Sequence, residues 1–284
     1  MSKPIPYGRQ NITEDDIKSV IETLQSDFLT QGPKINEFEN KFSKYVGSKY
    51  AVAVTNATAA LHVSVLSLGL KKGDRIITTP ITFAASANCA RFVGAEVWFA
   101  DIDPNTYLID IDDVKRLIES NPKGFFKGII PVDFAGLPVD LQEFRKLADE
   151  HNLWIIEDAC HALGASYKYK NKSYKIGSCK HSDICTFSLH PLKSITSGEG
   201  GIVCTNNSLL AKNIKTIRSH GIQKNKKDEH WVYDISEPGY NFRISEMNCA
   251  LALSQLGKLD SFINLRKKIS SQYINFFKSF EYLL

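Results

Sequence analysis

This sequence of 284 residues has little net charge and no long apolar run. Its 35 basic and 31 acidic residues leave a formal charge of +4, which is too small to indicate nucleic acid or a membrane surface as the main partner. No apolar stretch approaches the roughly 18 residues that span a bilayer. The opening residues MSKPIPYGRQ also lack the apolar centre of a signal peptide. We therefore expect a cytoplasmic protein whose partners are neither membranes nor nucleic acids.

Paired cysteine motifs are absent as well. The six cysteines are scattered through apolar segments without a CxxC pair, at positions 89, 160, 179, 185, 204 and 249. This spacing suits neither a zinc site nor a disulfide framework. We expect no metal site, and most of the cysteines should be small core residues.

Strand-like and helix-like segments alternate through the middle of the chain, from residue 50 onward. Such units predict an α/β fold with a mostly parallel central sheet flanked by helices. The expected pairs are YAVAVT with ATAALHVSVLSLGL, DRIITT with FAASANCARFVG, and KGIIPV with DLQEFRKLADEHN, after which LWIIED is a further strand. The basic, turn-rich segment SYKYKNKSYKIGSCKH should then form a hairpin or loop.

Two helices are expected before this region, over residues 13–25 and 35–46. Thr13 is a plausible cap of the first helix. The apolar residues that share one face of that helix are Ile17, Val20, Ile21 and Leu24.

The segment AVAVTNATAALHV has the pattern of a phosphate-binding turn, because an apolar strand runs into small residues that open a helix. A phosphate seat would be formed there by the free backbone N–H groups of Ala57 and Thr58, the Thr58 hydroxyl and the positive end of the helix dipole. A capped strand-to-helix connection without a ligand would show the same pattern. This segment alone leaves both interpretations open.

Three ionisable residues follow the strand in LWIIEDACHALGA: Glu157, Asp158 and His161. The strand is apolar on both faces, which indicates a central position, and ligands of open α/β sheets bind outside the carboxyl ends of the strands. A buried Asp158 could keep the pyridine nitrogen of a cofactor protonated. A salt-bridged structural carboxylate is the alternative.

Two further residues suit a planar cofactor. Phe83 follows a strand in TTPITFAASAN, where its ring could stack on a flat group, although most phenylalanines are core residues. Lys193 lies beside the glycine-rich turn of FSLHPLKSITSGEGG. Partial burial lowers the pKa of a lysine and suits it to imine chemistry, whereas an exposed lysine is the ordinary alternative. A phosphate seat, an aromatic ring, a strand-end aspartate and this lysine together describe a pyridoxal phosphate site.

Seven blocks of the sequence resemble, in order, the DegT/DnrJ/EryC1/StrS family of sugar-nucleotide aminotransferases. This family has the fold type I architecture of pyridoxal phosphate enzymes, and the resemblance runs from about residue 5 to the end of the chain. The stretches IPYGRQNI, DFLTQGPK, HPLKSITSGEGG and LSQLGKLDSF are most similar to the branch that makes pseudaminic acid. The seven blocks are TNATAALH, TTPITFAASAN, VDFAGLPVD, IIEDACHALGA, FSLHPLKSITSGEGG, RSHGI and GYNFRISEMNCALALSQL.

The resemblance implies a role for each matching residue. Lys193 would be the catalytic residue that forms the Schiff base, Asp158 would hold the pyridinium nitrogen, and Phe83 would cover the ring. The other implied cofactor contacts are the phosphate ligands Ala57, Thr58 and Ser188, His161 near the ring, and Asn241. Asn241 would reach the phosphate of the neighbouring subunit, which implies a homodimer with shared sites.

The resemblance also implies a transamination in two halves. Glutamate would give its amino group to the cofactor, and the C4 keto group of UDP-4-keto-6-deoxy-N-acetyl-L-altrosamine would then accept it. Other nucleotide-linked keto sugars, of the 4-amino-arabinose, perosamine or bacillosamine type, are alternatives. Lys193 excludes a dehydratase of the same fold, which has histidine at this place. A catalytically idle homologue that keeps the fold is a further alternative.

The C-terminal end departs from the family pattern. The chain stops at YINFFKSFEYLL, within an expected long helix that has no C-cap glycine, whereas relatives continue into a smaller domain. We therefore expect a chain without its C-terminal small domain. Its segments would be an N-terminal helical part (1–48), a cofactor-binding large domain (49–257) and the start of a long helix (258–284). Apolar faces prepared for the small domain would then be bare.

Overall fold

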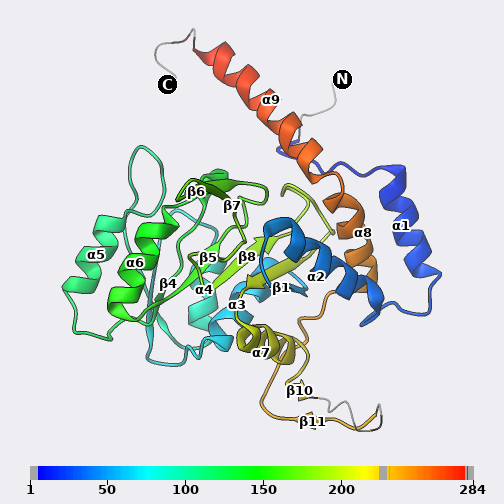
Figure 1. Cartoon of the computed structure of the whole chain (residues 1–284), viewed down its shortest axis with the longest axis horizontal. Helices are drawn as coiled ribbons and strands as arrows, with labels where there is room; N and C mark the ends of the chain where they lie inside the picture. Colours follow the sequence, from blue (N-terminus) through cyan, green and yellow to red (C-terminus); the bar gives the residue numbers. More distant parts are fainter. Residues whose placement is uncertain (1–5, 224–228, 230, 279, 281–284) are drawn as a thin grey trace.

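A seven-stranded sheet forms the centre of the structure (Figure 1). The computed structural model describes residues 6–223, 229, 231–278 and 280. Within the sheet, β9 alone runs antiparallel to its neighbours, so the expected mostly parallel sheet is confirmed. The LWIIED strand, β5, is the middle strand, as its two apolar faces predict. In spatial order the strands are β1 (Tyr50–Val54), β9 (Gly201–Thr205), β8 (Ile184–Ser188), β5 (Trp154–Asp158), β4 (Gly128–Ile129), β2 (Arg75–Thr78) and β3 (Glu96–Phe99).

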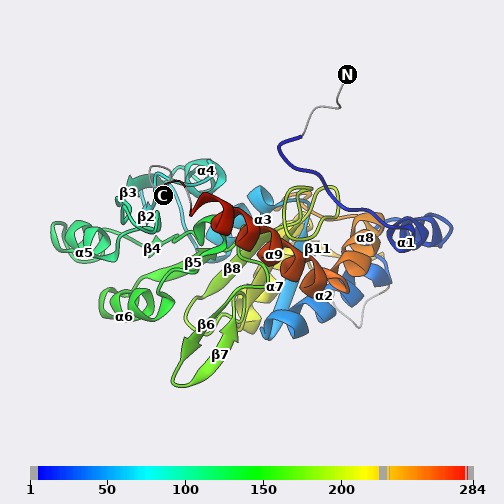
Figure 2. The same cartoon turned by 90° about the horizontal axis from the view of Figure 1, so that it is seen from above.

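Helices cover both faces of the sheet, as the two views in Figures 1 and 2 show. One face packs against α3 (Ala57–Ser67), α4 (Ala85–Phe92) and α7 (Ser208–Arg218). The opposite face packs against α2 (Pro33–Val46), α5 (Ile111–Glu119), α6 (Leu141–His151) and α8 (Glu246–Leu256). The predicted strand–helix pairs therefore occur where the sequence placed them.

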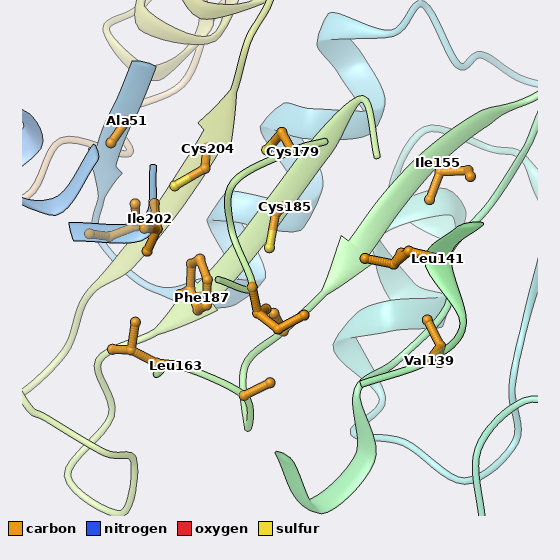
Figure 3. Packing of buried hydrophobic residues seen from close by; sticks show 14 of the residues in the cluster. Ala51, Val139, Leu141, Ile155, Leu163, Cys179, Cys185, Phe187, Ile202 and Cys204 are labelled. Atoms are coloured by element: carbon orange, nitrogen blue, oxygen red, sulfur yellow. The ribbon is translucent and has the colours of Figure 1, made fainter. Parts of the chain in front are cut away.

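Neighbouring residues of each strand point to opposite faces of the sheet. On β5, Ile155 belongs to the core beneath α2 and α6, whereas Ile156 belongs to the core beneath α3 and α4. Figure 3 shows the first of these cores, with Ile155, Cys185 and Phe187. Side chains two residues apart share a face, so Asp158 lies on the α3–α4 side and Glu157 on the opposite side.

The first helix, α1 (Glu14–Leu24), begins with a capping box. The side chain of Asp16 accepts from the backbone N–H of Thr13, which confirms the predicted cap. The helix packs on α8 through buried Asp16, whereas the exposed fractions of Ile17, Ile21 and Leu24 are 44%, 47% and 53%. Its apolar face is therefore exposed, and on the other face Asp16 accepts a hydrogen bond from Gln255 and forms an ion pair with Lys258.

Smaller elements complete the fold. The SYKYKNKSYKIGSCKH segment contains the hairpin β6 (Ser166–Tyr169) and β7 (Lys172–Lys175), as predicted. A second short hairpin joins β10 (Ile222–Gln223) to β11 (Asp234–Ile235), and a 3-10 turn spans Phe134–Gly136. Five of the six cysteines are buried, which confirms their expected place in the core.

The last helix, α9 (Leu259–Phe277), rises away from the sheet (Figure 1). Leu259 is the buried residue of this helix. Residues 1–5 of the expected N-terminal segment lie outside the described residues, as do residues 279 and 281–284 of the expected C-terminal helix. Among the helices that are described, none combines the length and the apolar character needed to cross a membrane.

Candidate active site

A cavity of about 540 Å³ lies at the carboxyl ends of the parallel strands. Its walls come from the turns that follow β1, β2, β5 and β8, which meet at one edge of the sheet. The predicted site residues that line it are Ala57, Thr58, Phe83, Asp158, His161, Ser188 and Lys193. Asn241 is the one predicted residue that this cavity does not include. The structure therefore brings together residues from four separate sequence motifs.

Asp158 is held in a fixed orientation at the end of β5. Its Oδ2 accepts from the hydroxyl of Ser86 at 2.6 Å, and its Oδ1 accepts from the backbone N–H of Cys160 at 3.2 Å. The residue is 4% exposed and forms no ion pair with any lysine or arginine in the described part of the chain. The alternative of a salt-bridged structural carboxylate is therefore not supported. A carboxylate so placed can bind a protonated ring nitrogen.

The predicted phosphate seat lies at the start of α3. The side chain of Asn56, the N-cap of α3, accepts from the N–H of Ala59 at 2.8 Å. The N–H groups of Ala57 and Thr58 belong to the first turn and have no carbonyl partner within the helix. A Cβ on Gly201 would lie 2.3 Å from the carbonyl oxygen of Asn56, so only glycine lets β9 pack this closely behind the seat.

The opposite wall of the cavity follows β8. Ser188 is buried at the end of this strand, and its Oγ accepts from the N–H of His190 at 3.3 Å. Lys193 lies in the turn that follows, and its backbone N–H donates to the carbonyl of His190 at 2.9 Å. The carbonyl of Lys193 accepts from Arg266 of α9 at 3.0 Å. These contacts fix the backbone of the lysine, while its half-buried side chain lines the cavity.

His161 and Phe83 complete the cavity wall. Burial and the charge of Lys193 lower the pKa of His161, against a smaller opposing effect of Asp158. The Nδ1 of His161 accepts from the N–H of Ala135 at 3.3 Å, so a neutral ring would carry its proton on Nε2. Phe83 is 74% exposed although it lines the cavity. Its ring is therefore a face that a flat ligand could cover.

Asn241 lies outside this cavity but near the phosphate seat. It is exposed and pairs with Ser219 in an isolated bridge. The carbonyl of the next residue, Phe242, accepts from the N–H of Thr55 at 2.9 Å. The segment is thus fastened beside the turn between β1 and α3, while the amide side chain of Asn241 stays available at the surface.

Sequence reasoning missed polar residues around the predicted set. Thr82, Cys160, His190 and Glu199 also line the cavity, and each lies within or next to a motif that was already singled out. Ser86 was missed although it binds Asp158. Ser86 lies in the first turn of α4, where a serine has no distinguishing pattern in the sequence. No group of three or more His, Cys, Asp or Glu residues suited to a metal occurs within the described ranges.

Comparison with known proteins identifies the family that the chain resembles over nearly its whole length. Residues 10–284 match the model of the DegT/DnrJ/EryC1/StrS aminotransferase family. The chain is 41% identical to the UDP-4-amino-4,6-dideoxy-N-acetyl-beta-L-altrosamine transaminase of Campylobacter jejuni, over 98% of this chain and 71% of that protein.

The fold of the chain is similar to that of two solved structures, among others. Helicobacter pylori PseC, an aminotransferase involved in the biosynthesis of pseudoaminic acid, is 35% identical with a TM-score of 0.89, over 99% of this chain and 72% of that one. The putative sugar aminotransferase Spr1654 from Streptococcus pneumoniae, in its PMP form, is 30% identical with a TM-score of 0.86, over 96% and 72%.

Proposed function

Because the chain belongs to the DegT/DnrJ/EryC1/StrS aminotransferase family, we propose that it aminates a UDP-linked keto sugar in pseudaminic acid biosynthesis. The acceptor would be UDP-4-keto-6-deoxy-N-acetyl-L-altrosamine, aminated at C4, and the donor would be glutamate. Two Campylobacter jejuni relatives named for this transamination are each 41% identical to the chain. The observation that carries the proposal is that Lys193 lines one cavity together with Asp158 and the phosphate seat.

The cofactor of this enzyme is pyridoxal phosphate, and the residues of the cavity fit it. Asp158 offers one carboxylate that no cation neutralises among the described residues, which suits a protonated ring nitrogen. The first turn of α3 offers free N–H groups and the Thr58 hydroxyl to a phosphate. When bound, pyridoxal phosphate supplies an electron sink that makes the α-proton of an amino acid acidic.

The protein residues then divide the remaining tasks. Ser188, with the N–H groups of Ala57 and Thr58, would bind the phosphate, and the Phe83 ring would cover one face of the cofactor. Asp158 would hold the proton on the ring nitrogen. These contacts fix the ring relative to Lys193, whose backbone is fastened by His190 and Arg266.

Lys193 would move the protons of the reaction. Its Nζ would take the proton from the α-carbon of the donor and, in the second half, deliver a proton to C4 of the sugar. The side chain forms no ion pair within the part of the chain that the structure describes. It is therefore free to reach both reacting carbons from a backbone that stays in place.

Conversion of a defined substrate tests this function. Purified protein incubated with pyridoxal phosphate, glutamate and UDP-4-keto-6-deoxy-N-acetyl-L-altrosamine should yield 2-oxoglutarate and the C4 amino sugar, identified by mass spectrometry and NMR. Lys193→Ala should abolish turnover and the visible absorbance of the bound cofactor, because no other side chain in the cavity is an amine. Full activity of this variant would refute the assignment. Amination of a different UDP-keto sugar instead would identify one of the alternative substrates.

The same proposal includes a homodimer in which Asn241 serves the neighbouring site. Its support is the exposed side chain, on a segment fastened beside the phosphate seat. Lys193→Ala and Asn241→Ala variants should each be inactive alone. A mixture should regain activity, because one site of a mixed dimer then has both residues intact. A mixture that stays inactive, although subunits exchange, would contradict shared sites.

A further inference from the structure

Two buried carboxyl groups lie on the far side of the sheet from the cavity. Glu157 is the neighbour of Asp158 on β5 and is 1% exposed, whereas Asp133 follows β4 and is 0% exposed. The Oε2 of Glu157 accepts from the hydroxyl of Ser182 at 3.1 Å. The Oδ1 of Asp133 accepts from the N–H of Val139 at 3.0 Å. Each carboxyl thus uses one oxygen in a bond to a protein donor.

The second oxygen of each group has no protein donor. Within the described residues, Oδ2 of Asp133 and Oε1 of Glu157 receive no hydrogen bond. The two side chains share one face of the sheet, because each belongs to the residue next to the paired residues Val132 and Asp158, and the charge of Glu157 acts on the pKa of Asp133. Two carboxylates can only accept, so their contact is satisfied only when a proton lies between them. Leaving both oxygens without a donor would cost the full desolvation penalty of buried polar groups.

In the part of the chain that the structure describes, neither carboxyl forms an ion pair with a lysine, an arginine or a histidine. The titratable groups that face the pair are Asp158 on β5, Cys160 in the following turn, Tyr167 on β6, Cys179 after β7, Cys185 on β8 and Cys204 on β9. All of these are neutral or anionic. Burial, and then the charge of Glu157, raise the pKa of Asp133 well above its ordinary value. Burial likewise raises the pKa of Glu157, although hydrogen bonds from Cys185, Ser182 and Asp133 act to lower it. Two full charges are therefore not sustained here.

We propose that Asp133 and Glu157 share one proton and act as a positioning pair behind the cofactor site. The pair carries a single negative charge and joins the end of β4 to the end of β5. The positioning role of the pair rests on the proposed function, because it depends on the role of Asp158 in cofactor binding. The shared proton itself is a property of the protein without its cofactor.

The backbone connects this pair to the cavity. The N–H of Asp133 donates to the carbonyl of Asp158 at 3.1 Å, and the N–H of Asp158 donates to the carbonyl of Pro131 at 2.9 Å. The bond from Val139 to Asp133 closes the loop that holds Ala135, whose N–H binds His161. The carboxyl pair therefore fixes the strand end that carries Asp158 and the loop that orients His161.

The pH dependence of unfolding tests the shared proton. A pKa that is higher in the folded than in the unfolded protein adds stability below the unfolded pKa, and this stability is lost as pH rises through the folded pKa. For one proton, the unfolding equilibrium constant of the cofactor-free protein should rise up to about tenfold per pH unit from about pH 5 upward. Asp133→Asn should remove this rise, because its amide donates to Glu157 without ionising, and Glu157→Gln should do the same.

Two results would overturn the proposal. If the unfolding equilibrium constants of the wild type and both amide variants changed with pH in the same way, no proton would be bound by this pair on folding. A slope that survives each single change and disappears only in the double variant would show that both carboxyls are protonated. Should the variants fail to fold, difference infrared spectra of the wild type must show a protonated carboxyl band that shifts in D₂O. Absence of that band at neutral pH would also refute the shared proton.

Asp16 provides a matched control of opposite sign. It is also a buried carboxyl, but its Oδ1 accepts from the ammonium group of Lys258 at 2.7 Å. Burial acts to raise its pKa, yet hydrogen bonds from Lys258 and its neighbours lower the pKa to about 2. The stability it adds is present above its unfolded pKa and is lost as pH falls through the folded pKa. Asp16→Asn should therefore alter the acid limb of the stability curve and leave the limb above about pH 5 unchanged.

Cofactor affinity tests the positioning role separately. Asp133→Ala removes the hydrogen bond from Val139 and the proposed shared proton, and should weaken pyridoxal phosphate binding on the order of tenfold. Asp133→Asn should restore most of the affinity. Equal affinities for the wild type and Asp133→Ala would refute the positioning role. If no variant and no wild-type protein bound the cofactor, the proposed function would fail, while the pH curves would still decide the shared proton.

Discussion

The two faces of the central sheet use neighbouring residues for opposite purposes. On β8, Phe187 packs against Phe42 with 5.3 Å between ring centroids, whereas the next residue, Ser188, lines the cavity. On β5, Glu157 is enclosed with Asp133, and the next residue, Asp158, faces the cavity. Figure 3 shows the enclosed face around Phe187 and Cys185. A strand end can therefore hold a dry core and a binding site one residue apart, because side chains alternate across the sheet.

The largest effect should come from the enclosed face of β8. Phe187→Ala leaves a cavity against Phe42 and should lower the free energy of unfolding by about 3–5 kcal/mol, measured by urea titration. Phe187→Leu should cost less because it keeps most of the volume. If Phe187→Ala were no more harmful to stability than the Ser188→Ala change described below, the contrast between the two faces would be wrong.

On the cavity face, Asp158→Asn should reduce turnover on the order of 100-fold without a comparable loss of stability. The amide no longer favours a protonated ring nitrogen, although it can still accept from Ser86. Steady-state kinetics and thermal unfolding of the same preparation measure both quantities. Ser86→Ala should reduce turnover less, because the charge of Asp158 remains. A turnover loss in Asp158→Asn that merely follows a loss of folded protein would contradict this role.

Ser188→Ala should weaken cofactor binding by roughly 10- to 100-fold, since a hydrogen bond to a charged group contributes about 1.5–3 kcal/mol. Stability of the cofactor-free protein should change little. Ser64→Ala is the matched control, because Ser64 is a buried serine whose hydroxyl donates to the carbonyl of Ala60 at 2.6 Å, away from the cavity. Equal dissociation constants of the two variants for pyridoxal phosphate, measured by absorbance titration, would show that Ser188 does not bind the phosphate.

The smallest effect is expected at Phe83. Loss of aromatic stacking in Phe83→Ala should weaken cofactor binding by roughly two- to tenfold, with stability unchanged because the side chain is 74% exposed. Phe92→Ala is the control, as Phe92 is 54% exposed and lies at the far end of α4 from the cavity loop. Weaker binding in the control than in Phe83→Ala would argue against stacking at this position.

Local patterns predicted most of the fold and most of the cavity. The apolar residues on both faces of β5 predicted its place in the middle of the sheet, and Lys193, Asp158 and Phe83 were all found in one cavity. The parallel strands explain this success, because their carboxyl ends meet at one edge whatever their separation in sequence. Ser86 escaped notice because a serine early in a helix has no distinguishing pattern of its own.

Other features followed no local rule. The sequence pattern puts Ile21 and its apolar neighbours on one face of α1, yet the helix packs through Asp16, because Lys258 and Gln255 satisfy that carboxylate. The pairing of Asp133 with Glu157 was equally hidden. These residues are 24 positions apart, and only the register of β4 beside β5 brings them together.

The sequence by itself determined the alternation of strands and helices up to β5, and it predicted the cofactor chemistry together with the lysine and aspartate proposed for it. These depend on periodicity and on side-chain types at fixed distances from strand ends, which are local quantities. Only the tertiary structure decided which face of each element is covered, and that two buried carboxyls meet without a cation. Burial and the satisfaction of hydrogen bonds depend on partners remote in the chain, and no local pattern records those partners.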